Sequence, residues 1–105
     1  MSEEEELRSL ISAIEAYARP KHILLFGSRA RGLARSDSDF DLCIIYERLP
    51  KRNLEVMQDL YRSIFPLSGH PVDLVVYEAE RFDAQALRRG TLESTIRSEG
   101  RVVYG

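Results

Sequence analysis

Two acidic side chains stand at the start of an apolar run near the middle of this chain. Asp39 and Asp41 are separated by one residue and lead into a segment that should form a buried strand. In an extended strand, residues two apart project from the same face, about 6.5 Å apart along the chain. The two carboxylates are therefore predicted to face one way, while Phe40, Leu42 and Ile44 face the core.

Neighbouring anions at the edge of an apolar core repel each other and lose hydration. A divalent cation would remove this difficulty, and Mg²⁺ needs only one or two carboxylates because water and substrate phosphates complete its coordination. The alternative is that Asp39 and Asp41 are turn or capping residues, since the SDSD stretch that includes Asp39 is a good loop sequence in its own right.

A third acid, Asp73, lies in the apolar segment 72–78. An unpaired charge is disfavoured among such neighbours, although a strand edge could solvate it. If this strand lies beside the one that follows Asp39, the three carboxylates can form one cluster. Three carboxylates can hold two metal ions about 3.5–4 Å apart, which clamps the attacking and leaving oxygens of an in-line displacement at phosphorus.

A glycine-serine turn precedes these acids. Gly27 ends an apolar segment, and a glycine there lets the backbone approach a ligand closely. If residues 28–31 begin a short helix, their backbone N–H groups and the Ser28 hydroxyl form an anion site. Arg29 and Arg31 follow, and guanidinium groups match phosphate geometry. The plainer alternative is a strand-to-helix turn with solvated arginines.

The elements that must position these residues follow from apolar spacing. Residues 3–18 have the periodicity of an amphipathic helix capped by Ser2. The continuous apolar segments 22–27, 39–47 and 72–78 are typical of strands covered on both faces. A helix between the last two strands is predicted, with Asn53 as its cap. Its apolar stripe is Leu54, Met57, Leu60, Tyr61 and Ile64.

The rest of the chain predicts two short helices, residues 79–89 and 91–98, with Thr91 capping the second. Residues 101–105 are expected to close the fold as a short strand. Strands that alternate with helices indicate an α/β fold, in which helices pack on a sheet. These patterns leave the strand order open.

Length and composition limit the classes of protein. At 105 residues we expect one domain, residues 1–105, with 44% hydrophobic and 30% charged residues as in soluble globular proteins. The net charge of -2 does not indicate a nucleic-acid partner. The sequence contains neither a long apolar run nor a basic-then-apolar N-terminus, so we expect no membrane span and a cytoplasmic location. Cys43, the only cysteine, cannot form an internal disulfide.

The stretch GSRARGLARSDSDFD, which has Gly-Ser, ten residues and then Asp-x-Asp, carries a family resemblance. It resembles the signature of the DNA polymerase β-like nucleotidyltransferase superfamily, in particular the MntA-type antitoxins of HEPN/MNT toxin–antitoxin pairs. The similarity extends to the third strand with Asp73. It implies a minimal nucleotidyltransferase with a small mixed sheet flanked by helices (α+β), like the polymerase β palm.

The resemblance also implies roles for individual residues. Asp39, Asp41 and Asp73 would bind two Mg²⁺ ions, and Asp73 would help to deprotonate the acceptor hydroxyl. Gly27 and Ser28 would hold the β- and γ-phosphates of ATP. The candidates for nucleotide binding are Gly27, Ser28, Arg29 and Arg31.

The implied reaction is transfer of AMP from ATP to a hydroxyl, with a tyrosine of a HEPN-type toxin as the expected acceptor. Because larger relatives carry an extra helical domain, a second protein or a second copy of the chain should complete the site. Two alternatives stay open. The chain could neutralise a partner by contact without turnover, or it could be a subunit of a small-molecule (antibiotic) adenylyltransferase.

Overall fold

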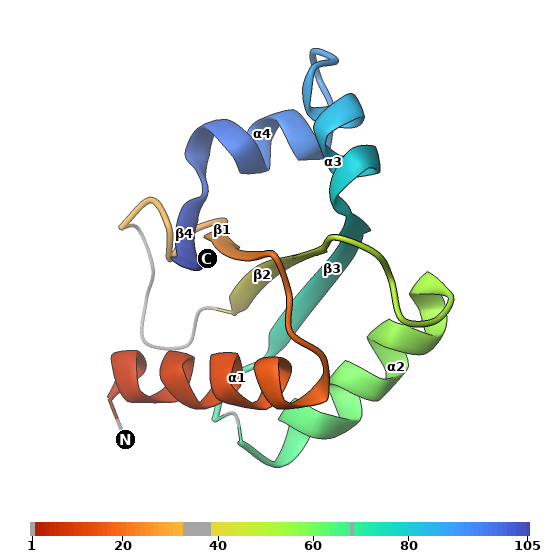
Figure 1. Cartoon of the computed structure of the whole chain (residues 1–105). Helices are drawn as coiled ribbons and strands as arrows, with labels where there is room; N and C mark the ends of the chain where they lie inside the picture. The colour runs from red at the N-terminus through yellow and green to blue at the C-terminus, as the bar shows by residue number, and fades with distance from the viewer. Residues whose placement is uncertain (1, 33–38, 68) are drawn as a thin grey trace.

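A computed structural model describes residues 2–32, 39–67 and 69–105. These residues form a four-stranded sheet in the order β3-β2-β1-β4, with helices on both faces (Figure 1). The strands β2 (Phe40–Tyr46) and β3 (Val72–Glu78) are parallel. The central strand β1 (His22–Phe26) pairs antiparallel with β2 and with β4 (Arg101–Tyr104). This mixed sheet between helices confirms the predicted fold class.

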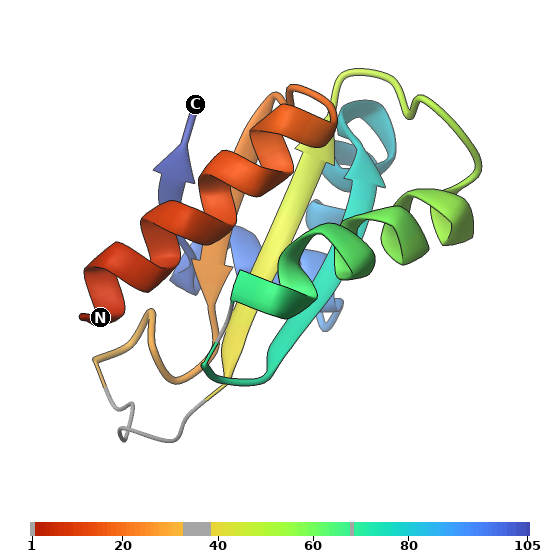
Figure 2. The same cartoon turned by 90° about the horizontal axis from the view of Figure 1, so that it is seen from below.

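The helices α1 (Glu3–Tyr17) and α2 (Asn53–Ile64) cover one face of the sheet (Figure 2). The side chains of Phe40, Leu42 and Ile44 point toward these helices and are 0% exposed. The prediction that these three residues face the core is confirmed. They anchor β2, so the residues between them must project from the opposite face.

The opposite face is covered in part by α3 (Ala79–Ala86) and α4 (Leu92–Glu99). Cys43 and Ile45 of β2 are buried there in a smaller apolar cluster. Thr91 caps α4 through a hydrogen bond that its hydroxyl accepts from the backbone N–H of Ser94, at 3.0 Å, as predicted. None of the described helices is long and apolar enough to cross a membrane.

The start of α2 differs from the prediction. The cap position is Arg52, which makes no side-chain capping bond, and Asn53 is the first helical residue. Leu54, predicted to be on the apolar stripe, is 66% exposed. Leu60 and Ile64 are buried as predicted, and Met57 is partly buried against the core. Val56, which was not predicted to be on the stripe, is buried in the first turns in place of Leu54. The buried stripe consists of Val56, Leu60 and Ile64.

Two side chains of α2 contact the backbone of the edge strand β3. The amide of Asn53 donates a hydrogen bond of 2.6 Å to the carbonyl of Val76. The hydroxyl of Tyr61 accepts one of 2.9 Å from the N–H of Leu74. These contacts satisfy polar backbone groups that β2, on the other side of β3, leaves unpaired.

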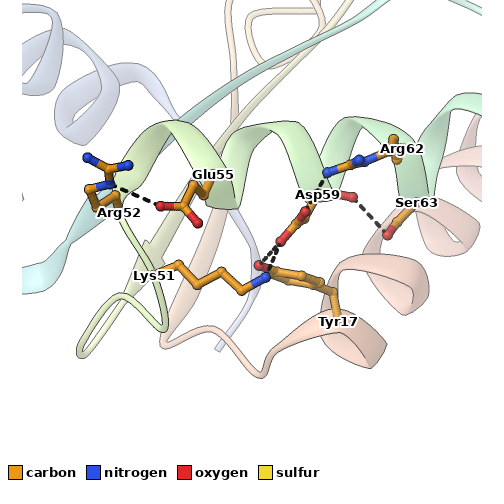
Figure 3. A network of polar contacts seen from close by, with 7 residues as sticks. All are labelled: Tyr17, Lys51, Arg52, Glu55, Asp59, Arg62 and Ser63. Atoms are coloured by element: carbon orange, nitrogen blue, oxygen red, sulfur yellow. Dashed lines mark hydrogen bonds and ion pairs between the residues drawn. The ribbon is translucent and has the colours of Figure 1, made fainter.

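A polar network joins α1 to α2 (Figure 3). The carboxylate of Asp59 accepts hydrogen bonds from the Tyr17 hydroxyl at 2.8 Å, from Lys51 at 3.0 Å and from Arg62 at 2.7 Å. The bond from Tyr17, followed by the one from Lys51, lowers the pKa of Asp59. Asp59 is thus an acid whose negative charge is compensated within the chain.

Candidate active site

Asp41 and Asp73 occupy paired positions on the adjacent parallel strands β2 and β3. Paired residues on neighbouring strands are about 4.8 Å apart and project from the same face of a sheet. That face is the one opposite Phe40 and Leu42. The condition that β3 lies beside β2 is therefore met, and the structure brings Asp41 and Asp73 together. Asp39 is exposed and lies directly before β2.

Among the residues that the structure describes, no cation pairs with the carboxyl group of Asp41 as Lys51 and Arg62 do with Asp59. Partial burial of Asp41 raises its pKa above the ordinary value. The negative charges of Asp73 and then of Asp39 raise this pKa further. Ionised Asp41 therefore lowers the free energy of unfolding of the protein. A bound cation would offset this loss.

Gly27 lies against the carboxylate of Asp41. Its φ of +74° is in the left-handed region, which side chains other than glycine's rarely adopt. A Cβ atom on Gly27 would come within 2.3 Å of Oδ2 of Asp41. The register explains this contact, because Phe26, the residue before Gly27, pairs with Asp41. The glycine-serine turn thus begins directly beside Asp41.

The turn itself differs from the expected helix start. Residues 27–32 form successive turns, in which the N–H of Arg31 donates to the carbonyl of Gly27 at 3.3 Å. Ser28 is half-buried beside Gly27. The side chain of Arg31 is 52% exposed, with its guanidinium 3.9 Å from the carboxylate of Glu99. About half of the Arg31 side chain is therefore accessible to solvent.

Arg29 is placed differently from the solvated arginine of the plainer alternative. Its side chain is only 2% exposed, and its guanidinium lies 4.1 Å from the centre of the Phe40 ring. One nitrogen is 3.1 Å from a carboxylate oxygen of Glu3, at the start of α1. Its Nε donates to the carbonyl of Asp39 at 3.2 Å. Arg29 is therefore a buried residue, whereas Arg31 is exposed.

Comparison with known proteins decides the family. The model of the nucleotidyltransferase domain matches residues 5–98, which is most of the chain. The chain belongs to this nucleotidyltransferase family. The family assignment confirms the predicted enzyme class, and residues 27–41 and Asp73 lie within the matched range.

Individual relatives of this nucleotidyltransferase agree with the assignment. A chain from Methanocaldococcus jannaschii, named as a protein adenylyltransferase, is 29% identical over 109 residues, covering 99% of this chain and all of its own length. A solved toxin–antitoxin structure with AMP-PNP is similar in fold, with a TM-score of 0.57 and 20% identity over 99% of this chain and 74% of that one. A toxin–antitoxin structure named MntA-HpeT has a TM-score of 0.54 and 20% identity, over 100% of this chain and 74% of its own.

The acids of this nucleotidyltransferase have the donor chemistry of a Mg²⁺ site. Asp41 and Asp73 offer hard oxygen donors from paired positions. Within the part of the chain that the structure describes, no three His, Cys, Asp or Glu side chains are close enough to form a ready metal centre. A pair of carboxylates nevertheless fits Mg²⁺, because water and phosphates supply its other ligands. Metal binding by Asp39, Asp41 and Asp73 stays a prediction.

One buried acid near the site was not singled out from the sequence. Glu6 is 4% exposed, whereas the three glutamates before it are exposed. Its carboxylate accepts a hydrogen bond from the N–H of Gly69 at 3.1 Å and contacts Nδ1 of His70 at 2.9 Å. These contacts hold the segment that leads to Asp73. The available signal was spacing, since Glu6 lies four residues before the buried Leu10.

Proposed function

We propose that this nucleotidyltransferase transfers AMP from ATP to a hydroxyl group of a protein partner, in a Mg²⁺-dependent reaction. The observation that carries the proposal is the pairing of Asp41 with Asp73 on adjacent strands, next to the turn at Gly27. The names of the relatives support the choice of substrates, since one is named as a protein adenylyltransferase and another complex contains AMP-PNP.

Each residue has a role in this proposal. Asp39, Asp41 and Asp73 would hold two Mg²⁺ ions, which neutralise charge on the phosphates when bound. The backbone at Gly27 and the hydroxyl of Ser28 would bind the β- and γ-phosphates, because they border the acids. The exposed guanidinium of Arg31 would add a charged contact to the same phosphates.

The reaction needs no nucleophile from the chain. The acceptor oxygen attacks the α-phosphorus of ATP, a new P–O bond forms, and the bond to the departing pyrophosphate breaks. The proton of the acceptor hydroxyl passes to the carboxylate of Asp73, which is exposed and therefore accessible to an incoming group. Alignment of the reactants and compensation of their charge supply most of the acceleration.

We further propose that residues 1–105 act as one minimal domain whose site is completed by a cytoplasmic partner, a HEPN-type toxin that offers a tyrosine hydroxyl. The exposure of Asp39 and Asp73 supports this, because acceptor and nucleotide need more cover than the described residues give them. A second copy of the chain is the alternative way to provide that cover.

The test is transfer of label from ATP carrying radioactive α-phosphate, with Mg²⁺, to a partner protein that co-purifies with the chain. Label on that protein, with an added mass of one AMP on a tyrosine-containing peptide, supports the proposal. Label on a small-molecule hydroxyl instead would identify a small-molecule adenylyltransferase. Neutralisation of the partner without any label would favour the contact-only antitoxin.

A further inference from the structure

Arg29 joins three separate parts of the chain around the candidate site. Its guanidinium bonds the carbonyl of Asp39, ten residues away, at 3.2 Å. It also forms an ion pair of 3.1 Å with Glu3 and lies 4.1 Å from the Phe40 ring centre. A charged side chain that is 2% exposed is costly unless such contacts compensate it. Because burying this charge is costly, the contacts that compensate it should determine where the Arg29 guanidinium lies.

The peptide unit between Asp39 and Phe40 is held at both of its polar groups. Its carbonyl accepts the bond from Nε of Arg29, and its N–H donates to the carbonyl of Pro71 at 2.9 Å. Pro71 lies two residues before Asp73, so this peptide also connects the start of β2 to the start of β3. This peptide unit is also the first of the two that connect Asp39 to Asp41.

We infer that Arg29 is a positioning residue, which fixes the Asp39–Asp41 segment for cation binding and is not a ligand of phosphate. This inference rests on the proposed cation site. Loss of the bond to the Asp39 carbonyl would let the backbone between the two acids rotate, so their carboxylates would no longer be held ready for one ion. The neighbouring Arg31, whose side chain is 52% exposed, keeps the phosphate role.

The experiment compares matched substitutions, Arg29→Met and Arg31→Met, in the full chain. Binding of Mn²⁺, a paramagnetic substitute for Mg²⁺, is measured by electron paramagnetic resonance without nucleotide. The dissociation constant of ATP is then measured at saturating Mn²⁺. We expect Arg29→Met to weaken Mn²⁺ binding by about 10–100-fold, as loss of a residue that orients metal ligands does, and to leave ATP affinity unchanged once Mn²⁺ is saturating. Arg31→Met should leave Mn²⁺ binding unchanged and weaken ATP binding at saturating Mn²⁺.

Two further variants keep the test interpretable. Arg29→Lys retains the positive charge but not the guanidinium geometry, so it serves if Arg29→Met fails to fold by circular dichroism. Glu3→Gln removes the charge of the ion pair but keeps an acceptor oxygen for the guanidinium and spares the bond to Asp39. Mn²⁺ affinity should therefore stay within about twofold of the parent, since an ion pair with a largely exposed carboxylate contributes little.

The outcomes separate this inference from the proposed function. Folded Arg29 variants that bind Mn²⁺ as tightly as the parent would overturn the inference, even if their melting temperature falls. Weaker ATP binding at saturating Mn²⁺ would also overturn it, because that result identifies a phosphate ligand. If the parent protein itself binds no Mn²⁺, the proposed cation site fails and the inference fails with it.

Discussion

Two aspartates of this chain, Asp59 and Asp41, meet opposite electrostatic surroundings. Asp59 accepts hydrogen bonds from a tyrosine, a lysine and an arginine, which lower its pKa (Figure 3). Partial burial of Asp41, and then the negative charges of Asp73 and Asp39, raise its pKa. The first acid strengthens the contact between α1 and α2. The second has no paired cation among the described residues, and a carboxyl group with a raised pKa is typical of a site that acts on a ligand.

The largest expected effect comes from removing the negative charge of Asp41. Asp41→Asn should reduce AMP transfer by about 10³-fold or more, roughly 4 kcal/mol in the activation barrier, because the cation loses a central ligand. Circular dichroism should stay unchanged. The matched control is Asp59→Asn, which removes an equal charge outside the site and should keep the rate per folded molecule. Equal losses in both variants would contradict the distinction between the two acids.

The next effect concerns the space beside Asp41. Gly27→Ala should lower the free energy of unfolding by about 1–3 kcal/mol, because a strained backbone is combined with a clash. The added Cβ would lie 2.3 Å from Oδ2 of Asp41. Gly90→Ala is the control: its φ is +78°, but a Cβ there meets no atom within 4 Å. Urea denaturation of both variants measures the difference, and equal losses would mean that the carboxylate contact contributes nothing.

A smaller effect is expected from added metal. Mg²⁺ at ten times its dissociation constant should stabilise the parent protein by about 1.4 kcal/mol, because only the folded state assembles the acids. Asp59→Asn should show the same rise in melting temperature in a thermal scan with and without EDTA. Asp41→Asn should show little. A rise in melting temperature of equal size in Asp41→Asn would show that the cation binds without Asp41.

The smallest effect is a pH dependence of opposite sign in the two variants. The folded-state pKa of Asp59 is lowered, so its contribution to stability is present above the unfolded pKa and is lost as pH falls through the folded value. The folded-state pKa of Asp41 is raised, so its cost is absent below the unfolded pKa and is fully present once pH exceeds the folded value.

Melting temperatures of metal-free protein between about pH 3 and pH 7 measure this dependence, in the range where aspartates titrate. Asp59→Asn should be less stable than the parent at pH 7, and the gap should close in acid. Asp41→Asn should be more stable than the parent at pH 7, and its advantage should also disappear in acid. The same sign for both variants would contradict the electrostatic contrast.

Local patterns predicted much of this fold. The strand at Val72–Glu78 has the predicted bounds, and Thr91 caps α4 as expected, since each depends on neighbours in sequence. The in-register pairing of Asp41 with Asp73 was only a conditional prediction. Strand order depends on contacts between distant segments, which apolar periodicity does not encode.

Two polar side chains have surroundings that local sequence did not predict. Asn53 was expected to cap α2, but its amide finds a partner on β3, outside its own helix. Arg29 was a candidate for nucleotide binding, or a solvated arginine in the alternative, and its contacts with Glu3, Asp39 and Phe40 from two other segments could not be read from its own segment. A polar residue's sequence neighbours show what it can bond, whereas tertiary packing decides which partner it meets.

The contacts of Asn53 and Tyr61 with the edge strand have a practical consequence. The strand that carries Asp73 is an edge strand of the described sheet, and unprotected edge strands can pair with other chains to form intermolecular sheets. Asn53 and Tyr61 of α2 hydrogen-bond the backbone at Val76 and Leu74, which makes pairing with another strand unfavourable there. Asp73 itself stays exposed. Variants that remove the side chains of Asn53 and Tyr61 should therefore precipitate at concentrations where the parent stays in solution, so catalytic redesign near Asp73 should leave both in place.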